Sequence, residues 1–251
     1  MKFQAVILAA GKGTRMKSDK PKVLHNLAGS PMIEYVLDAT KNSGIKKITL
    51  VIGFKKEEVI QAVEKWAKPH SELQIDFCVQ EEQLGTGHAL KVAEMQLKNN
   101  IPYLLVMLGD VPLVKSETLQ KAAQEIESRE AAALVITTKL DDPTGYGRIL
   151  RDEDGILKGI KEQADASESE KQIKEVNTGI FIFDNRKVWN FVHQLKSANA
   201  QEEYYLTDII ELLNQSGETV LAYTAEDSKQ FLGINSVENL KEIEKEVQLK
   251  L

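Results

Sequence analysis

A glycine-rich turn near the start of the chain reads Ala9-Ala10-Gly11-Lys12-Gly13-Thr14-Arg15-Met16. It follows an apolar run over residues 3–8, which predicts a buried strand. Glycines let the backbone turn tightly and leave its N–H groups open to a ligand. From residue 12 to residue 25 the chain carries one acid, Asp19, and the cations Lys12, Arg15, Lys17, Lys20 and Lys22. The stretch is typical of a phosphate site, and equally of a solvated basic turn on an ordinary α/β domain.

Two common nucleotide-binding motifs are excluded at this turn. The dinucleotide fingerprint needs a third glycine where this chain has Met16, and an acid after the second strand, where Gly53-Phe54 stand. The phosphate-binding loop of the common NTPases ends in Gly-Lys-Ser/Thr, which Gly11-Lys12-Gly13 does not supply. Any phosphate site here therefore belongs to a different class.

Length and charge limit the possible functions. The 251 residues suffice for one large α/β domain or two small ones with a sizeable core. The net charge of -6 argues against nucleic acid as a partner and leaves a phosphate site dependent on local cations. The single cysteine, Cys78, allows no disulfide within the chain and fits a reducing compartment. The apolar run after Lys2 is too brief for a signal sequence, and no run could span a bilayer. We expect a cytoplasmic protein without a membrane partner.

Apolar runs alternate with helical patterns along the whole chain. The expected strands cover residues 3–8, 47–52, 73–79, 103–108, 131–138, 178–183 and 219–223, with a hairpin over 147–152 and 156–161. The expected helices cover residues 31–44 with Ser30 as cap, 56–67, 87–97, 116–128, 187–195, 204–214, and 236 to about 251. This alternation predicts one α/β domain over residues 1–251. Its Rossmann-like sheet is mixed and mostly parallel, with helices on both faces.

The ends of two strands indicate where a ligand would bind. Ligands of open α/β sheets lie beyond the carboxyl ends of the strands, where strand order reverses. The first strand ends at the glycine turn and the strand over 103–108 ends at Gly109-Asp110, so Arg15 and Asp110 are expected to face one crevice. An acid in this position can hold Mg²⁺, although Asp before Val-Pro is also ordinary turn chemistry.

A second polar segment, residues 80–88, follows a strand and opens a helix. Backbone N–H groups at Gly85-Thr86 can bind a base carbonyl or an anion, and Gln80 offers the donor and acceptor that a pyrimidine edge needs. The bland alternative is a helix entry with Thr86 as cap. We interpret His88, which has no obvious partner, as structural.

The second half of the chain carries further candidates. Residues 141–148 are too rich in glycine for a plain hairpin entry, and Gly147 could present its N–H to a sugar hydroxyl. Glu162 and Asn177 could bind around a sugar ring, or be a surface acid and a strand cap. Packing explains the tyrosines at 204 and 205 better than sugar contact does. Asn235 is either a metal ligand or a neighbour of the last helix cap.

These motifs become specific through their order along the chain. In that order the chain closely resembles the bacterial N-acetylglucosamine-1-phosphate uridyltransferases over nearly its whole length. It is similar to the uridyltransferase half of the bifunctional enzyme that makes UDP-N-acetylglucosamine, a peptidoglycan precursor. The motifs that carry the resemblance are Leu8 to Met16, Pro21-Lys22-Val23-Leu24-His25, Gln83 to Ala89, Gly109-Asp110-Val111-Pro112-Leu113, Asp141 to Arg148, Asn177-Thr178-Gly179 and Glu203 to Asp208.

The resemblance implies transfer of uridylyl from UTP to N-acetylglucosamine 1-phosphate, with Mg²⁺ as cofactor. It implies that residues 1–113 mainly bind the nucleotide and residues 131–235 mainly bind the sugar. The catalytic residues would be Arg15 and Lys22, and the Mg²⁺ ligands Asp110 and Asn235. The nucleotide would contact Leu8, Ala9, Ala10, Gly11, Gln80, Gly85, Thr86, Gly109 and Asp110. The sugar would contact Gly147, Glu162, Asn177, Thr207 and Asn235.

The chain departs from the family pattern in two places. Leu108 stands where the family often has tyrosine before Gly-Asp, so a contact made by that ring would be missing. No hexapeptide repeat follows, so we expect no acetyltransferase activity, no trimer built through such a domain, and a monomer or weak oligomer. One alternative is a nucleotidyltransferase for another sugar 1-phosphate. Another is a non-catalytic regulatory subunit that binds nucleotide sugar, although such a subunit would be expected to lose its cations or its metal acid.

Overall fold

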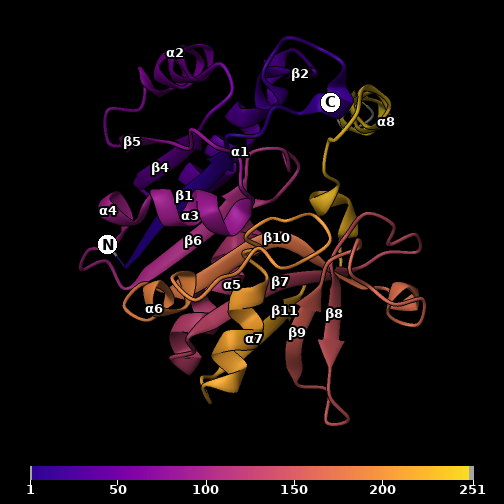
Figure 1. Cartoon of the computed structure of the whole chain (residues 1–251). Helices are drawn as coiled ribbons and strands as arrows, with labels where there is room; N and C mark the ends of the chain where they lie inside the picture. The colour runs from indigo at the N-terminus through magenta and orange to yellow at the C-terminus, as the bar shows by residue number, and fades with distance from the viewer. Residues whose placement is uncertain (1, 249–251) are drawn as a thin grey trace.

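The computed structural model describes residues 2–248, and a nine-stranded sheet forms the centre of this part of the chain (Figure 1). Its strand order is β11-β7-β10-β6-β1-β4-β5, and off this path β8 pairs with β10 and β9. The strands are β1 (Phe3–Ala9), β4 (Lys47–Ile52), β5 (Gln74–Val79), β6 (Tyr103–Leu108), β7 (Ala133–Lys139), β8 (Arg148–Arg151), β9 (Leu157–Lys161), β10 (Glu175–Asp184) and β11 (Val220–Thr224). A separate ribbon pairs β2 (Asn26–Leu27) with β3 (Ser30–Pro31).

The sheet is mixed and mostly parallel, as the alternation of patterns predicts. Strands β6, β1, β4 and β5 run parallel, and β11 runs parallel to β7. Strand β10 is antiparallel to both β6 and β7, and therefore joins the two halves of the chain into one sheet. Because β4 and β6 flank β1 on opposite sides, strand order reverses at β1. This is where open α/β sheets bind ligands.

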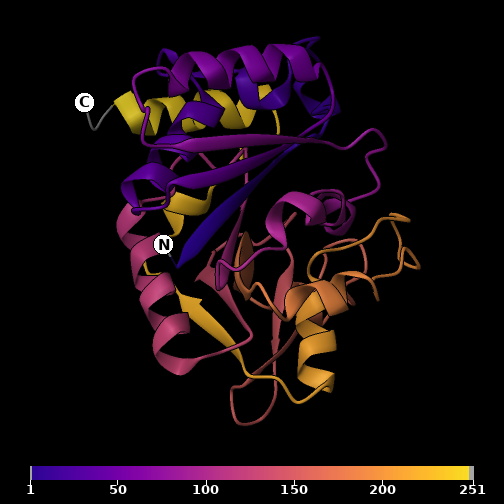
Figure 2. The same cartoon turned by 90° about the vertical axis from the view of Figure 1, so that its left-hand side faces the viewer.

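Helices cover both faces of the sheet, and Figure 2 shows α5 on one side with α6 and α7 on the other. The helices are α1 (Met32–Asn42), α2 (Lys56–Ala67), α3 (Thr86–Val92), α4 (Glu94–Leu97), α5 (Ser116–Arg129), α6 (Val188–Val192), α7 (Asp208–Gln215) and α8 (Val237–Gln248). Short 3-10 turns are η1 (Thr14–Met16), η2 (Lys22–Leu24), η3 (Glu170–Gln172) and η4 (Ser228–Phe231). Among the described residues, no helix has the length and apolar content that crossing a bilayer requires.

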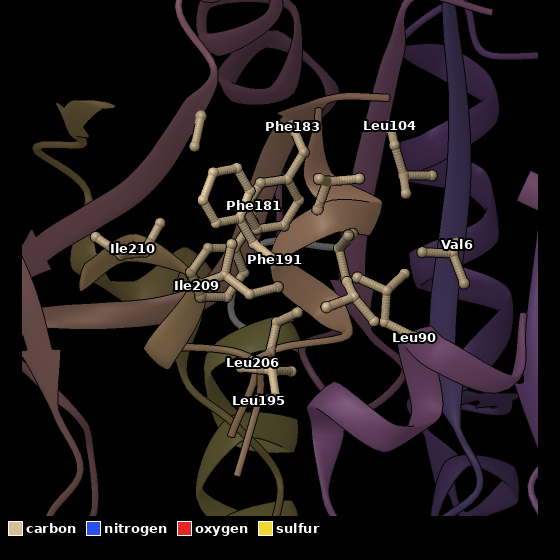
Figure 3. Close-up of a cluster of buried hydrophobic side chains, with 14 of the residues drawn as sticks. Val6, Leu90, Leu104, Phe181, Phe183, Phe191, Leu195, Leu206, Ile209 and Ile210 are labelled. Carbon is tan, nitrogen blue, oxygen red and sulfur yellow. The ribbon is translucent and has the colours of Figure 1, made fainter. Parts of the chain in front are cut away.

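Alternation along the strands produces two cores, one on each face. Val6 of β1 belongs to the core under α3, α6 and α7, whereas Ile7 beside it belongs to the core under α1, α2 and α5. Figure 3 shows the first core, where Phe181 and Phe183 of β10 stack with ring centroids 5.7 Å apart. The strand ends that carry the polar loops are thus held from both faces.

Three predicted helices begin or end elsewhere. The predicted helix over 87–97 is wrong as a single element, because it breaks at Ala93 between α3 and α4. Ser30 is not a helix cap: it pairs with Leu27 in the ribbon, and α1 begins after it at Met32. The predicted helix over 204–214 begins only at Asp208, because residues 204–206 bond to the loop over 84–87 instead.

The last helix packs beside the β2–β3 ribbon that follows the basic turn. Ser236 caps α8 as predicted, since its Oγ accepts the N–H of Asn239 at 3.2 Å. Ile243 of α8 is buried against Leu27, and Figure 1 shows α8 next to β2. The end of the predicted helix, residues 249–251, lies outside the described residues. This packing places Asn235 close to the basic turn.

Candidate active site

Two adjoining cavities lie at the carboxyl ends of β1 and β6. The larger cavity, about 420 Å³, is lined by the glycine turn and the loop after β5. The smaller cavity, about 240 Å³, is lined by residues 145–147, β10 and the start of α7. Five residues line both cavities and form what we call the shared wall. They are Arg15, Thr86, Leu108, Asp110 and Asn235.

Nearly all of the residues singled out from the sequence line these cavities. The larger cavity takes Leu8, Ala9, Ala10, Gly11, Lys22, Gln80 and Gly85 in addition to the shared wall. The smaller cavity takes Gly147, Glu162, Asn177 and Thr207. Gly109 lines neither cavity. The Gly109 N–H donates to the Leu8 carbonyl at 2.9 Å, and this hydrogen bond extends the pairing of β6 with β1 by one residue.

Two cations and two oxygen-bearing side chains meet at the shared wall. Lys22 forms a part-buried ion pair with Asp110, and its Nζ donates to Asn235 Oδ1 at 2.6 Å. Arg15 Nη2 donates to the same oxygen at 2.8 Å. The Ile234 N–H donates to the Asp110 carbonyl at 3.0 Å, which fastens the segment before α8 to the end of β6. Residues from both ends of the chain therefore converge on one point.

The oxygens at this point suit a small divalent cation. Carboxylate and amide oxygens are ligands of Mg²⁺, and Asp110 and Asn235 both direct one toward the Lys22 ammonium. Among the side chains that are described, residues 2–245, no group of three or more His, Cys, Asp or Glu gathers at metal-binding distance. Mg²⁺ commonly takes one or two protein ligands and completes its octahedron with water and phosphate oxygens. The donor set thus fits an ion that arrives with a phosphorylated substrate.

Gln80 is buried and held in one orientation at the floor of the larger cavity. Its Nε2 contacts the Gly85 carbonyl at 3.1 Å and His88 Nδ1 at 3.0 Å. Among the described residues nothing donates to its Oε1, which leaves an acceptor for a ligand. The structure supplies a partner for His88 that the sequence does not make obvious, because the first turn of α3 brings His88 back to Gln80. Nothing in the sequence indicates this pairing except that the two residues flank the same glycine turn.

Hydrogen bonds connect the loop over 84–87 to residues 204–206. The Gly87 N–H donates to the Tyr204 carbonyl at 2.7 Å, and the Tyr204 N–H donates to the Leu84 carbonyl at 2.8 Å. Thr86 Oγ1 accepts the Leu206 N–H at 3.1 Å. Thr86 is therefore a cross-link and not the helix cap of the bland alternative, since α3 has no side-chain cap. The segment that leads to Thr207 is thereby fixed against the larger cavity.

Polar groups of the smaller cavity form a second cluster. Thr207 Oγ1 donates to Glu162 Oε1 at 3.0 Å, and the Asn177 N–H donates to the Gly147 carbonyl at 2.9 Å. Burial raises the pKa of Glu162, the Thr207 hydrogen bond opposes this, and nearby carboxylates, Asp208 first, raise it further. A carboxylate held in this way is a strong acceptor for the hydroxyl or amide of a ligand.

Two residues that sequence reasoning treated lightly also shape the smaller cavity. Tyr146 lies between the cavity and the segment before Asn235, with its hydroxyl 3.4 Å from both the Phe231 carbonyl and the Gly233 nitrogen. Leu108 packs against Gly179, where an added Cβ would collide with it. No sequence signal marks Tyr146 beyond its place between two glycines.

Comparison with known proteins gives consistent relatives. Residues 4–237 match the family described as nucleotidyl transferase. The chain is 45% identical over 231 residues to the bifunctional protein GlmU of Streptococcus suis (strain 98HAH33), covering 92% of this chain and 48% of that protein. It is 43% identical over 250 residues to the GlmU of Heliobacterium modesticaldum (strain ATCC 51547 / Ice1), covering 100% of this chain and 53% of that protein. The chain thus spans about half the length of the curated relatives it matches.

Proposed function

The chain belongs to the nucleotidyl transferase family, and we propose that it transfers uridylyl from UTP to N-acetylglucosamine 1-phosphate. The products would be UDP-N-acetylglucosamine and pyrophosphate. The observation that carries the proposal is the shared wall. There Arg15, Lys22, Asp110 and Asn235 meet between two cavities, one of a size for a nucleotide and one with the polar groups of a sugar site. Relatives named as bifunctional GlmU support the choice of this reaction.

The reaction needs two anions to be brought together. A phosphate oxygen of the sugar 1-phosphate forms a bond to the α-phosphorus of UTP, and the bond from that phosphorus to the bridging oxygen breaks as pyrophosphate leaves. The attacking phosphate is already ionised, so no general base is required. At an effective dielectric constant near 20, one pair of like unit charges about 4 Å apart costs roughly 4 kcal/mol. Catalysis is then mainly positioning and charge stabilisation.

Arg15 of the shared wall and Lys22 beside it would lie near the phosphate groups. Arg15 offers a planar fork to the leaving phosphates, and Lys22 a point charge beside the α-phosphate. Asp110 and Asn235 would hold Mg²⁺, which would neutralise phosphate oxygens when bound. The Lys22 ammonium donates to a side-chain oxygen of Asp110 and to one of Asn235. The ammonium is thereby kept at the boundary of the two cavities.

The orientation of Gln80 supports uracil as the base. Its amide nitrogen is engaged by Gly85 and His88, so its carbonyl oxygen faces a ligand as an acceptor. Uracil carries a hydrogen on N3 and can donate to this oxygen, whereas N3 of cytosine is an acceptor and would be left unpaired. A buried unmatched polar group costs about 1–3 kcal/mol. UTP is therefore favoured over CTP.

In the smaller cavity, Glu162, Asn177, Thr207 and the Gly147 backbone provide the polar groups for the sugar. Thr207 already orients Glu162, and the Asn177 backbone is tied to Gly147. The four groups come from β10 and from three loops, one before β8, one after β9 and one before α7. In N-acetylglucosamine an acetamido group replaces the 2-hydroxyl of glucose, so its N–H and its carbonyl can pair with two of these groups at once.

The proposal is tested by mass-spectrometric detection of UDP-N-acetylglucosamine after incubation with UTP, N-acetylglucosamine 1-phosphate and MgCl₂. We expect product with UTP, far less with CTP, loss of product on adding EDTA, and recovery with excess MgCl₂. Absence of product in a folded protein that still binds UDP-N-acetylglucosamine would contradict the proposal and support a regulatory subunit instead.

A further inference from the structure

Arg148, the first residue of β8, is a buried arginine that lies behind the smaller cavity and does not line it. Its side chain is 1% exposed. Within the described part of the chain, Arg151 pairs with Glu175 and Arg186 with Asp184, whereas Arg148 forms no ion pair. Its Nε has no hydrogen-bond partner. Burying a guanidinium without a carboxylate has a large desolvation cost, so stability alone does not favour arginine here.

The remaining nitrogens of Arg148 contact Tyr146, which lines the smaller cavity, and Gln163, which follows the lining residue Glu162. Nη1 donates to the Tyr146 carbonyl, and Nη2 donates to Gln163 Oε1 at 2.7 Å. A longer contact of 3.4 Å reaches the Lys171 carbonyl. The same Gln163 oxygen accepts the Gly145 N–H at 3.2 Å. One guanidinium and one amide thus connect the glycine loop over 145–147 to the chain immediately after Glu162.

Tyr146 and Gln163, which Arg148 contacts, are sequence neighbours of two residues that we propose to contact the sugar. Gly147 lies between Tyr146 and Arg148, and Glu162 precedes Gln163. A Cβ added at Gly147 would be 3.3 Å from Glu162 Oε2, so the two walls touch at this point. A shift of the loop relative to the end of β9 would therefore move the Gly147 backbone and the Glu162 carboxylate apart.

We propose that Arg148 is a positioning residue for the sugar phosphate: with Gln163 it fixes the loop over 145–147 against Glu162 in the geometry that the sugar requires. The inference rests on the proposed function. The planar fork of an arginine reaches the Tyr146 carbonyl and Gln163 together, which accounts for arginine in a buried place where no described carboxylate forms an ion pair with it and Asp142 acts only at longer range. Because Arg148 lies away from the larger cavity, UTP binding does not depend on it.

The test compares Arg148→Met and Gln163→Leu with Arg151→Met as the matched control. Arg151 lies on the same strand but points to a surface ion pair with Glu175. For both test variants we expect KM for N-acetylglucosamine 1-phosphate to rise about tenfold or more, and KM for UTP to stay within about twofold of wild type. The control should keep both values.

A binding readout accompanies the kinetics. The ratio of the Kd for UDP to the Kd for UDP-N-acetylglucosamine, measured by calorimetry, should fall in Arg148→Met and Gln163→Leu through weaker binding of the nucleotide sugar alone. If Arg148→Met does not fold, Gln163→Leu carries the test, because Gln163 is only half-buried. Unchanged KM for the sugar phosphate in folded variants, or equal losses for both substrates, would overturn the inference. Absence of product from wild type would instead refute the proposed function.

Discussion

At the scale of single residues, the Lys22 ammonium holds the shared wall together. It contacts Asp110 and Asn235, which come from the end of β6 and the start of the last helix segment. Arg15 adds a second cation on the same Asn235 oxygen. In a chain whose net charge is -6, this local pair is what can attract a triphosphate.

Replacing Lys22 by alanine should therefore affect turnover more than folding. We expect Lys22→Ala to lower kcat by about 10²–10³-fold, the usual effect of removing one preorganised charge from a transition state. Its melting temperature should remain close to wild type, because the Lys22 side chain is still 13% exposed and the pair lies at the edge of a cavity. Lys121→Ala, an exposed lysine on α5, is the control. A wild-type rate in Lys22→Ala would remove Lys22 from the mechanism.

The raised pKa of Glu162 predicts how the free energy of unfolding depends on pH. Burial raises its pKa above the ordinary 4.5, so the folded state binds a proton more tightly than the unfolded state. The free energy of unfolding therefore falls as pH rises from the pKa of Glu162 in the unfolded state to its higher pKa in the folded state. Glu162→Gln removes this penalty and keeps an acceptor for Thr207. The variant should be more stable than wild type near pH 7, and the difference should vanish near pH 4.

Urea unfolding of both proteins at the two pH values measures this difference. The substitution changes only residue 162, so the cations of the site, such as Arg15, are the same in both proteins. A Glu162→Gln variant that is less stable at neutral pH, or equally shifted at both pH values, would show that the carboxylate is not destabilised by burial.

At this scale the sequence predicts side chains with strong local signals and misses those whose partners are far away. Arg15 lies in the glycine turn after one strand and Asp110 follows another, which is enough to predict that they face one crevice, whereas the role of Lys22 is implied by the family resemblance. The hydrogen bonds of His88 with Gln80 and of Arg148 with Gln163 depend on tertiary structure, which no local sequence pattern indicates. Those residues accordingly appear ordinary in the sequence.

At the scale of elements, the loop over 84–87 depends on Gly85. Its φ of 103° and ψ of 175° belong to a region that only glycine adopts readily. An added Cβ would also lie 2.7 Å from the Tyr204 carbonyl oxygen. The close approach lets residues 204–206 bond to this loop, which connects the two cavities through Thr86 and Thr207.

Gly85→Ala should damage this element in a way that a turn glycine elsewhere does not. We expect a loss of more than about 3 kcal/mol of stability, or a loop that rearranges and no longer binds UTP, because backbone strain and collision add. Gly217→Ala is the matched control, since Gly217 also has a positive φ of 74° but nothing within 4 Å of an added Cβ. It should lose only about 1–2 kcal/mol. Equal effects at both positions would show that the contact with Tyr204 is unimportant.

Elements with a clear period are predicted well from this sequence, and their junctions are not. The helix at Lys56–Ala67 and the strand at Tyr103–Leu108 have the predicted bounds. Residues 204–207 carry a helical pattern yet lie outside α7, because residues 84–87 take the backbone groups of Tyr204 and the Leu206 N–H. Long-range hydrogen bonds of this kind override local propensity.

At the scale of the whole molecule, the site depends on contact between two segments that are far apart in the sequence. The basic turn after β1 and the segment before α8 are joined through Asn235, and β10 joins the sheet of the first half to that of the second. The smaller cavity belongs mostly to the second half and the larger one mostly to the first. The two substrates would therefore meet at a boundary that neither half forms alone.

The most direct test of this account is pyrophosphate release from UTP and MgCl₂, with N-acetylglucosamine 1-phosphate and glucose 1-phosphate compared at equal concentrations. We predict release mainly with N-acetylglucosamine 1-phosphate. Release mainly with glucose 1-phosphate would retain nucleotidyl transfer and contradict the assignment of Glu162 and Asn177. No release with either sugar phosphate, from folded protein, would contradict the proposed reaction itself.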